Sequence, residues 1–284
     1  MIRKFWILAL VASMAACGSK KEVDPAGFAG GLVGAINATS DSPALNFRGN
    51  NQLQRSTYDS TLPFGTGSGL VAKGVGDVLL SVAYARPGAE GVFLIEDFEF
   101  LLGLDDEWTF ISTGSIAVPQ LIAIRNDPIV VTELVAEVQF VNASSNLPTA
   151  EFHLTDIDDA LGVPDATVAA GQYTDLLTVG FFADARLRVR EPGSDVVLWD
   201  SGRFIVPTGT RTQFILIDYF GPSGNGVRVL GAGAGAVSPF GNEDLPSQVR
   251  VVNFIDDVAA IDIYFGDVSG APDYAAASFA EVGD

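Results

Sequence analysis

The stretch "VNASSNLPTAEF", from Val141 to Phe152, has the pattern of a short strand, a turn and a second strand. The pattern recurs without a gap in "INATSDSPALNF" (residues 36–47) and in "VNFIDDVAAIDI" (residues 252–263). Asn and Asp in the middle of each stretch can bond their own backbone and favour a connection between strands. Apolar and polar residues then alternate, as in a strand with one buried face. The chain therefore carries one structural unit three times.

The three copies align on Asn37, Asn142 and Asn253, which are separated by 105 and 111 residues. A glycine follows each Asn after 28 to 30 residues, at Gly65, Gly171 and Gly283. We expect the Asn side chains to satisfy backbone groups at the end of a strand. A ladder of Asn residues that binds a ligand is the alternative.

Each complete copy holds many short strand-like runs separated by turn signals, without a sustained 3.6-residue period. The sequence therefore predicts an all-β fold of tandem Ig-like β-sandwich domains, the last one incomplete. The predicted segments are a signal peptide (1–16), a lipid anchor and tether (17–27), repeat 1 (28–126), repeat 2 (132–230), a linker (231–247) and a partial repeat 3 (248–284).

The third copy, "VRVVNFIDDVAAIDIYFGD" followed by "ASFAEVGD", resembles the bacterial family called domain of unknown function 4397. Copy two matches the family pattern next best. Copy one matches more loosely, because the Gly-rich "GTGSGLVAKGVGD" (residues 65–77) replaces a strand. The resemblance implies tandem Ig-like domains outside the cytoplasm and supplies no catalytic residues. The third copy stops at Asp284, so we expect a fragment; a partial copy that pairs through an open edge is the alternative.

The N-terminus has the features of a secretory signal peptide. Arg3 and Lys4 precede an uncharged run, residues 5–16, which is shorter than the roughly 20 apolar residues of a membrane-spanning helix. The run ends beside Cys17, the only cysteine, and this ending resembles the bacterial lipobox, in which the cysteine is acylated with chains such as palmitate. Gly18 in place of aspartate implies an outer-membrane lipoprotein, facing the periplasm or the exterior. An ordinary signal peptide with an unmodified Cys is the alternative.

The acidic composition limits the partners of the protein. Without residues 1–16 the chain has 14 basic and 35 acidic side chains, a formal charge of −21. Such a surface repels phosphate backbones, which excludes nucleic acid as a partner. The predicted partners are the membrane, through the lipid anchor, and a glycan or protein that the sequence does not identify.

Few side chains are candidates for catalysis or metal binding. His153, the only histidine, alternates with Phe152, so we expect it on the solvent face of a strand. No cofactor and no metal are predicted. The calcium candidates are Asp156, Asp158 and Asp159, although their stretch lacks the Gly and Glu of an EF-hand loop. The Gly-Ala run at residues 231–236 lacks the Lys of a phosphate-binding loop and reads as a linker.

These observations favour a cell-envelope lipoprotein without enzymatic activity, which either binds a partner or serves as a structural spacer. The alternative is a hydrolase or accessory subunit that uses acidic loops, which clustered carboxylates with shifted pKa values in a concave pocket would favour. A stalk that presents a further domain is the third reading.

Overall fold

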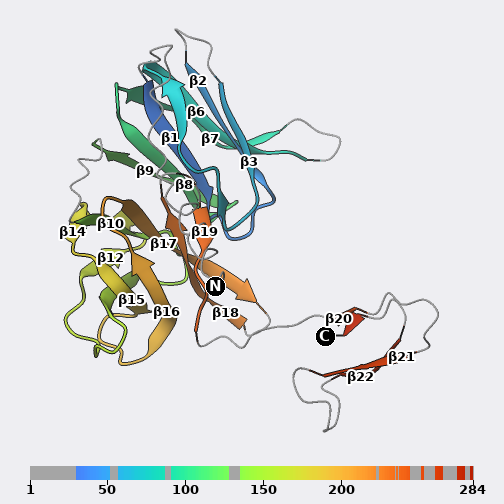
Figure 1. Cartoon of the computed structure of the whole chain (residues 1–284). Coiled ribbons are helices and arrows are strands. Elements are labelled where there is room, and N and C mark those ends of the chain that lie inside the picture. The colour runs from blue at the N-terminus through green and yellow to red at the C-terminus, as the bar shows by residue number, and fades with distance from the viewer. Residues whose placement is uncertain are drawn as a thin grey trace, which may run out of the picture. The chain divides into compact units, whose positions relative to one another are not determined.

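The computed structural model describes residues 30–51, 57–86, 91–127, 135–221, 224–233, 235, 237–243, 251–252, 260–264, 274–278 and 282–283. The described residues form strands and turns without a helix, which confirms the all-β class. They divide into one compact unit up to Asn242 and another from Glu243 (Figure 1). The predicted signal peptide, Cys17 and the tether lie outside the described residues. Within the described part, no helix is long and apolar enough to cross a membrane.

The first sandwich consists of the blue to green strands of Figure 1. One sheet has the order β4 (Thr66–Gly67), β1 (Gly30–Asn37), β8 (Glu107–Ser115), β9 (Val118–Asn126), with β5 (Val71–Gly74) also paired to β1. The other sheet has the order β3 (Thr57–Leu62), β2 (Leu45–Asn51), β6 (Gly76–Tyr84), β7 (Val92–Leu102). Strands β1 and β8 are parallel, and every other pair in this sandwich is antiparallel.

The second sandwich repeats this topology in the green to orange strands. One sheet has the order β13 (Gln172–Tyr173), β10 (Ala136–Asn142), β17 (Arg211–Gly221), β18 (Gly224–Ala232), β19 (Val237–Pro239), with β14 (Leu177–Val179) also paired to β10. The other has the order β12 (Ala166–Ala169), β11 (Thr149–Asp156), β15 (Phe182–Arg190), β16 (Val197–Val206). Strands β10 and β17 are parallel, like β1 and β8. The second sandwich differs by one added strand, β19.

Asn37 connects three segments of the first sandwich. Its side chain is fully buried, and its Nδ2 donates to the Leu62 carbonyl at 3.0 Å. Its Oδ1 accepts from the Thr39 N–H at 3.0 Å, and its backbone carbonyl accepts from the Gly65 N–H at 2.8 Å. Gly65 has a φ of 71°, which an L-residue adopts only at a cost.

Asn142 makes the corresponding bonds in the second sandwich, with one difference: its Nδ2 donates to the Leu147 carbonyl, whereas Asn37 Nδ2 donates to the Ser42 hydroxyl at 3.1 Å. Asn142 Nδ2 donates to the carbonyls of Leu147 at 3.0 Å and Val168 at 3.1 Å, and its Oδ1 accepts from the Ser144 N–H at 3.1 Å. Gly171, with a φ of 75°, donates its N–H to the Asn142 carbonyl at 2.8 Å. The predicted structural role of the aligned Asn is therefore confirmed in both sandwiches.

The second unit shows part of the same hairpin in copy three. Strand β21 (Ala260–Ile263) pairs with β22 (Tyr274–Ser278), and β20 (Val251–Val252) pairs with β23 (Val282–Gly283), both antiparallel. Ile261 aligns in sequence with Leu45 and Ala150 of the first two copies. Each of the three pairs with a residue of the next strand along the chain. Asn253 lies outside the described residues.

Each sandwich has its own apolar core. The first core contains Leu45, Phe47, Leu80, Leu102 and Phe110 among its buried residues. In the second core, Phe140 stacks between Phe152 and Phe214, with ring centroids 4.9 and 5.8 Å apart, and Trp199 is 1% exposed. These cores account for the alternation that the sequence shows.

A third apolar cluster joins the two sandwiches. It consists of Ile36, Ala38, Ile111, Ile122 and Ile124 from the first and Val141, Ala143, Ile215, Ile217 and Leu230 from the second. Along β17, Phe214 and Leu216 face the core of their own sandwich, whereas Ile215 and Ile217 face this shared cluster. The sheets that contain β1 and β10 are thus buried on both faces where they meet.

The predicted linker 231–247 is wrong at its start. Residues 231–232 belong to β18, and β19 pairs back onto that strand. A Cβ at Gly231 would lie 2.3 Å from the Phe240 ring, so the glycine makes room for an aromatic side chain that packs on the second core. Val237 packs against the shared cluster. Gly231, at the start of the Gly-rich run, therefore serves close packing.

Candidate functional site

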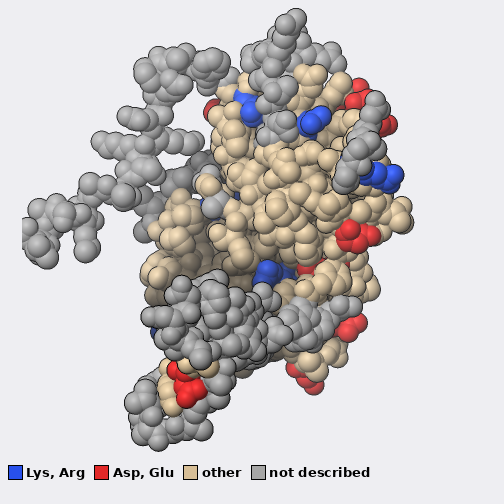
Figure 2. Space-filling view, turned by 90° about the vertical axis from the view of Figure 1, so that its right-hand side faces the viewer, with Lys and Arg blue, Asp and Glu red and all other residues tan. Residues whose placement is uncertain are grey.

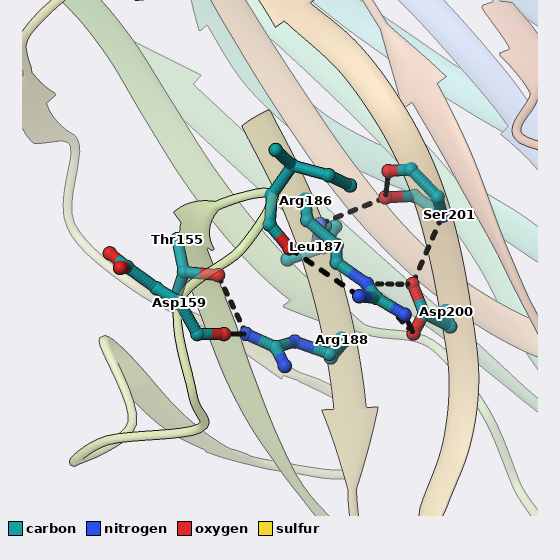
Figure 3. Close-up of polar contacts among 9 residues, drawn as sticks. Thr155, Asp159, Arg186, Leu187, Arg188, Asp200 and Ser201 are labelled. Atoms are coloured by element: carbon teal, nitrogen blue, oxygen red, sulfur yellow. Dashed lines mark hydrogen bonds and ion pairs between the residues drawn. The ribbon is translucent and has the colours of Figure 1, made fainter. Parts of the chain in front are cut away.

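The outer face of the β11–β15–β16 region carries a row of charged side chains. Alternation along β15 directs Ala185, Leu187 and Val189 into the second core, so the intervening arginines lie on the opposite face. The cross-strand pairs on that face are Glu151 with Arg190, His153 with Arg188, and Thr155 with Arg186. We call these six residues, together with Asp200, the arginine face; part of it is drawn in Figure 3.

Arg186 and Asp200 form a bidentate ion pair at one end of the arginine face (Figure 3). The Arg186 Nε lies 2.9 Å from Oδ1, and Nη2 lies 2.6 Å from Oδ2, of Asp200. The Gly202 N–H also donates to Asp200 Oδ1 at 3.0 Å, from a bulge where Gly202 has a φ of 59°. Asp200 is 4% exposed, so these bonds hold its carboxylate in a fixed orientation.

Arg190 and Glu151 form the ion pair at the other end. The Arg190 Nε donates to Glu151 Oε2 at 2.6 Å. The same oxygen lies 3.7 Å from the Nε2 of His153, beyond hydrogen-bond distance. Both terminal arginines of the row therefore have a carboxylate of their own.

Arg188, the middle arginine of the row, has no carboxylate among its hydrogen-bond partners in the described part of the chain. Its Nη2 donates to the Thr155 hydroxyl at 2.7 Å and to the Asp159 carbonyl at 2.8 Å, so Arg188 bonds neutral oxygens in the described part of the chain (Figure 3). Arg188 is 7% exposed, and its Nε has no partner among the described residues. Burial, followed by the positive charge of Arg186, lowers the pKa of Arg188.

His153 is fully buried, which corrects the expectation of a solvent-exposed strand residue. It does lie on the outer face, where the charged groups that act on it are those of Arg190, Glu151, Asp165 and Arg188. Burial, followed by the nearby Arg190, lowers the pKa of His153, so the imidazole is neutral at pH 7. Neither ring nitrogen has a hydrogen-bond partner in the described part of the chain.

The calcium candidates do not converge. Asp159 contributes its backbone carbonyl to Arg188, and its N–H donates to the Asp156 carbonyl in a turn at 3.1 Å. Across the described residues, no group of three or more His, Cys, Asp or Glu side chains is arranged to hold a metal ion. Asp158 is exposed on the same turn.

A second polar cluster lies where the sandwiches meet. Arg211 of β17 approaches Glu137 Oε2 with Nη2 at 2.7 Å and Glu107 Oε2 with Nη1 at 3.5 Å, and it donates to the Asp127 carbonyl at 2.8 Å. Burial raises the pKa of Glu107, while Arg211 acts in the opposite direction. One guanidinium thus bonds groups from both sandwiches.

The cavity beside Arg211 is too small for an organic ligand. It is lined by Glu107, Thr109, Arg211 and Gln213 among others, and its volume is about 20 Å³, which suits a single water molecule. Gln213 donates to Gln139 Oε1 at 2.8 Å beside it. The buried carboxyl with a raised pKa, Glu107, therefore lies in a packed junction and not in a pocket that could admit a hydrolase substrate.

The rest of the surface shows no comparable grouping on the side drawn in Figure 2. There, uncharged residues cover most of the described surface, and acidic and basic side chains are spread singly. The arginine face is the candidate functional site, because Arg188 and His153 are buried there with polar atoms that have no partner among the described residues. Sequence reasoning missed it, although the Arg-x-Arg-x-Arg spacing at residues 186–190 places the three side chains on one face of a strand.

Comparisons with known proteins add little to this geometry. No protein-family model matches the chain, and no curated protein matches it. The chain is similar to the Bacillus anthracis TIE protein at 10% identity, with 75% of this chain and 44% of that chain covered and a TM-score of 0.22. It is also similar to a candidate adhesin from Bacteroides ovatus at 6% identity, with 76% and 96% covered and a TM-score of 0.25. The chain spans less than half the length of the TIE protein, and these TM-scores carry no argument about function.

Proposed function

We propose that the protein is a non-enzymatic cell-envelope lipoprotein in which two fused sandwiches hold a binding surface in a fixed orientation. The observation that carries this proposal is the third apolar cluster. Flexible tandem domains meet through linkers, whereas here ten apolar residues from both sandwiches are buried together. Each fully buried Ile or Leu contributes about 1.5–3 kcal/mol, so the junction resists opening.

Polar contacts support the same conclusion. The Thr113 hydroxyl of the first sandwich donates to the Ala143 carbonyl of the second. Asn126 approaches Gln139 at 3.4 Å, and Arg211 lies between Glu107 and Glu137. Directional bonds of this kind fix the relative rotation of two packed sheets as well as their contact.

Anchoring completes the proposal and rests on the sequence. The lipobox-like ending at Cys17 supports a lipid anchor, and Gly18 supports the outer membrane. The resemblance to domain of unknown function 4397 supports an extracytoplasmic location. Metabolic labelling with palmitate tests the anchor directly: labelled protein is expected in the membrane fraction, and Cys17→Ser should abolish the label.

Spin-label distances test the fixed orientation. Labels at Val118 and Val163, which are 64% and 90% exposed, report on the first and second sandwich. With Cys17 replaced by Ser, a narrow distance distribution is expected. Ile215→Asp in the shared cluster should broaden it, whereas Ile205→Asp, at a position 63% exposed, should not. A broad distribution in the parent chain would contradict the proposal.

A further inference from the structure

The unpartnered polar atoms of the structure gather at one place. Besides two indole nitrogens, the buried side-chain atoms without a hydrogen-bond partner among the described residues are both ring nitrogens of His153 and the Nε of Arg188. These two residues face each other across β11 and β15 on the same side of the sheet. Directly opposed residues have Cβ atoms about 4.5–5.5 Å apart, so the three atoms belong to one local environment.

Carboxylates lie near both residues, Asp200 and Asp159 near Arg188 and Glu151 and Asp165 near His153, but the hydrogen bonds of the three arginines differ. Arg186 and Arg190 each bond a carboxylate of the chain, at 2.6 Å in both cases. Arg188, between them, bonds a hydroxyl and a backbone carbonyl. A guanidinium presents donors in a planar fork that matches the two oxygens of a carboxylate. The neutral ring of His153 offers one further N–H donor beside that fork.

We propose that Arg188 and His153 form a binding site for the carboxylate group of a ligand. The Arg188 Nε–H and an Nη–H bond the carboxylate oxygens, and the imidazole N–H donates to one of them. Of the three unpartnered atoms of Arg188 and His153, two then gain a partner, and only the second ring nitrogen does not. This inference rests on the binding role proposed above and names the chemistry that the arginine face would recognise.

The loop of residues 157–165 lies beside Arg188 and supplies one of its hydrogen-bond acceptors. Its ends are fixed, because the Ile157 N–H donates to the Asp184 carbonyl at 2.8 Å and the Asp165 N–H to the Phe152 carbonyl at 2.9 Å. Between them the loop is largely exposed, and Val163 is 90% exposed. The Asp159 carbonyl is the loop's hydrogen bond to Arg188. A carboxylate replaces this neutral acceptor with a charged one, which is the stronger partner for a guanidinium.

The first sandwich provides an internal comparison. At the positions of His153 and Arg188 it has Arg48 and Ser81, and Ala83 stands in the place of Arg190. The carboxylate site is therefore a property of the second sandwich and not of the shared topology.

The single histidine makes the test direct, because the imidazole signals of the full-length chain in detergent arise from His153 alone. Acetate, glucuronate and N-acetylaspartate are titrated at constant ionic strength against protein labelled with ¹³C-histidine. We expect saturable shifts of the ring C–H signals and an increase of the His153 pKa on binding. Tighter binding of glucuronate assigns the carboxylate to an acidic sugar, and tighter binding of N-acetylaspartate, which has an α-carboxylate and a side-chain carboxylate, assigns it to an amino-acid carboxylate of a peptide or protein.

Variants separate the site from a general charge effect. Arg188→Gln should weaken binding at least tenfold, and Arg188→Lys, which keeps the charge without the fork, serves if Arg188→Gln does not fold. Arg203→Gln removes an arginine that is 64% exposed on the same sheet and should leave the affinity unchanged. Absence of saturable shifts in the parent chain, or equal binding by both Arg188 variants and the parent, overturns the proposal. Neither outcome depends on the spin-label distances, so the two proposals can fail separately.

Discussion

The two sandwiches share a backbone plan but differ in what their outer faces carry. Apart from the added β19, the two have the same strand order. Each has one parallel pair, β1 with β8 and β10 with β17, and each has a buried Asn whose side chain donates to a carbonyl shortly before the following glycine turn. On the corresponding outer faces, the first sandwich has Leu79, Ser81 and Ala83 where the second has three arginines. The repeated motif therefore sets the topology, and the outward positions are free to differ.

The largest loss of stability is expected on replacing the buried Asn that both repeats share. Asn142→Ala leaves two carbonyls and one N–H unsatisfied in a fully buried place. An unsatisfied buried group costs about 1–3 kcal/mol, so we expect a loss of about 3 kcal/mol or more in the free energy of unfolding. Urea denaturation measures this loss. Asn146→Ala, at an exposed position in the same turn, serves as the control; an equal loss in the control would show that Asn142 has no special role.

Asn37→Ala sharpens the comparison, because Asn37 makes the equivalent bonds in the first sandwich. A loss of similar size in both variants is expected if one motif stabilises both folds. A loss confined to one sandwich would mean that the shared pattern is maintained for different reasons in the two copies.

An intermediate loss of stability is expected on breaking the Arg186–Asp200 ion pair, which belongs to the second sandwich. Asp200→Ala removes the bidentate partner of Arg186 and the acceptor of the Gly202 N–H. Breaking a buried pair costs about 3–5 kcal/mol, and because Arg186 is 28% exposed we expect about 2–3 kcal/mol. Asp184→Ala breaks the exposed pair with Arg203, at 3.0 Å on the same sheet, and should cost less than about 1 kcal/mol. Equal losses would show that the Arg186–Asp200 pair contributes no more than an exposed ion pair does.

The smallest change in stability is expected from the titration of Glu107, at the junction of the two sandwiches. Burial raises the pKa of Glu107 in the folded chain above its usual value of 4.5, so the folded state holds a proton more readily than the unfolded state. Stability should therefore rise as the pH falls through the folded pKa, and the gain should be complete below the unfolded pKa near 4.5. Glu107→Gln should abolish this dependence, whereas Glu99→Gln, at an exposed site, should keep it. A parent chain whose stability falls over that range while Glu107→Gln remains flat would contradict the assignment.

The sequence predicted the features that depend on neighbouring residues. The all-β class follows from alternation, and the role of Asn37 and Asn142 follows from the ability of Asn to bond nearby backbone. The burial of His153 could not be predicted in this way, because alternation along β11 does not show which residues of other segments, such as Arg190 of β15, the fold brings near it. The same holds for Phe240, whose ring occupies the space above Gly231.

The sequence contains a pattern that indicates the shared cluster and that a strand with one buried face does not explain. The run "FILI" at residues 214–217 is apolar on both faces of β17, a pattern typical of a strand that is covered on both sides. Which surface covers the second face depends on how two sheets pack, and alternation within one strand does not specify it. The candidate site was missed for a related reason, because the partners of the arginines come from β11 and β16.

Single-tryptophan unfolding tests the central claim, that the sandwiches form one cooperative unit, most directly. With Trp6 replaced, Trp108 reports on the first sandwich and Trp199 on the second when the other is changed to Phe. Urea transitions followed by the two fluorophores should coincide in midpoint and slope, because one shared core couples both sandwiches. Two separate midpoints, unaffected by Ile215→Asp, would show that the sandwiches unfold independently and would contradict the account.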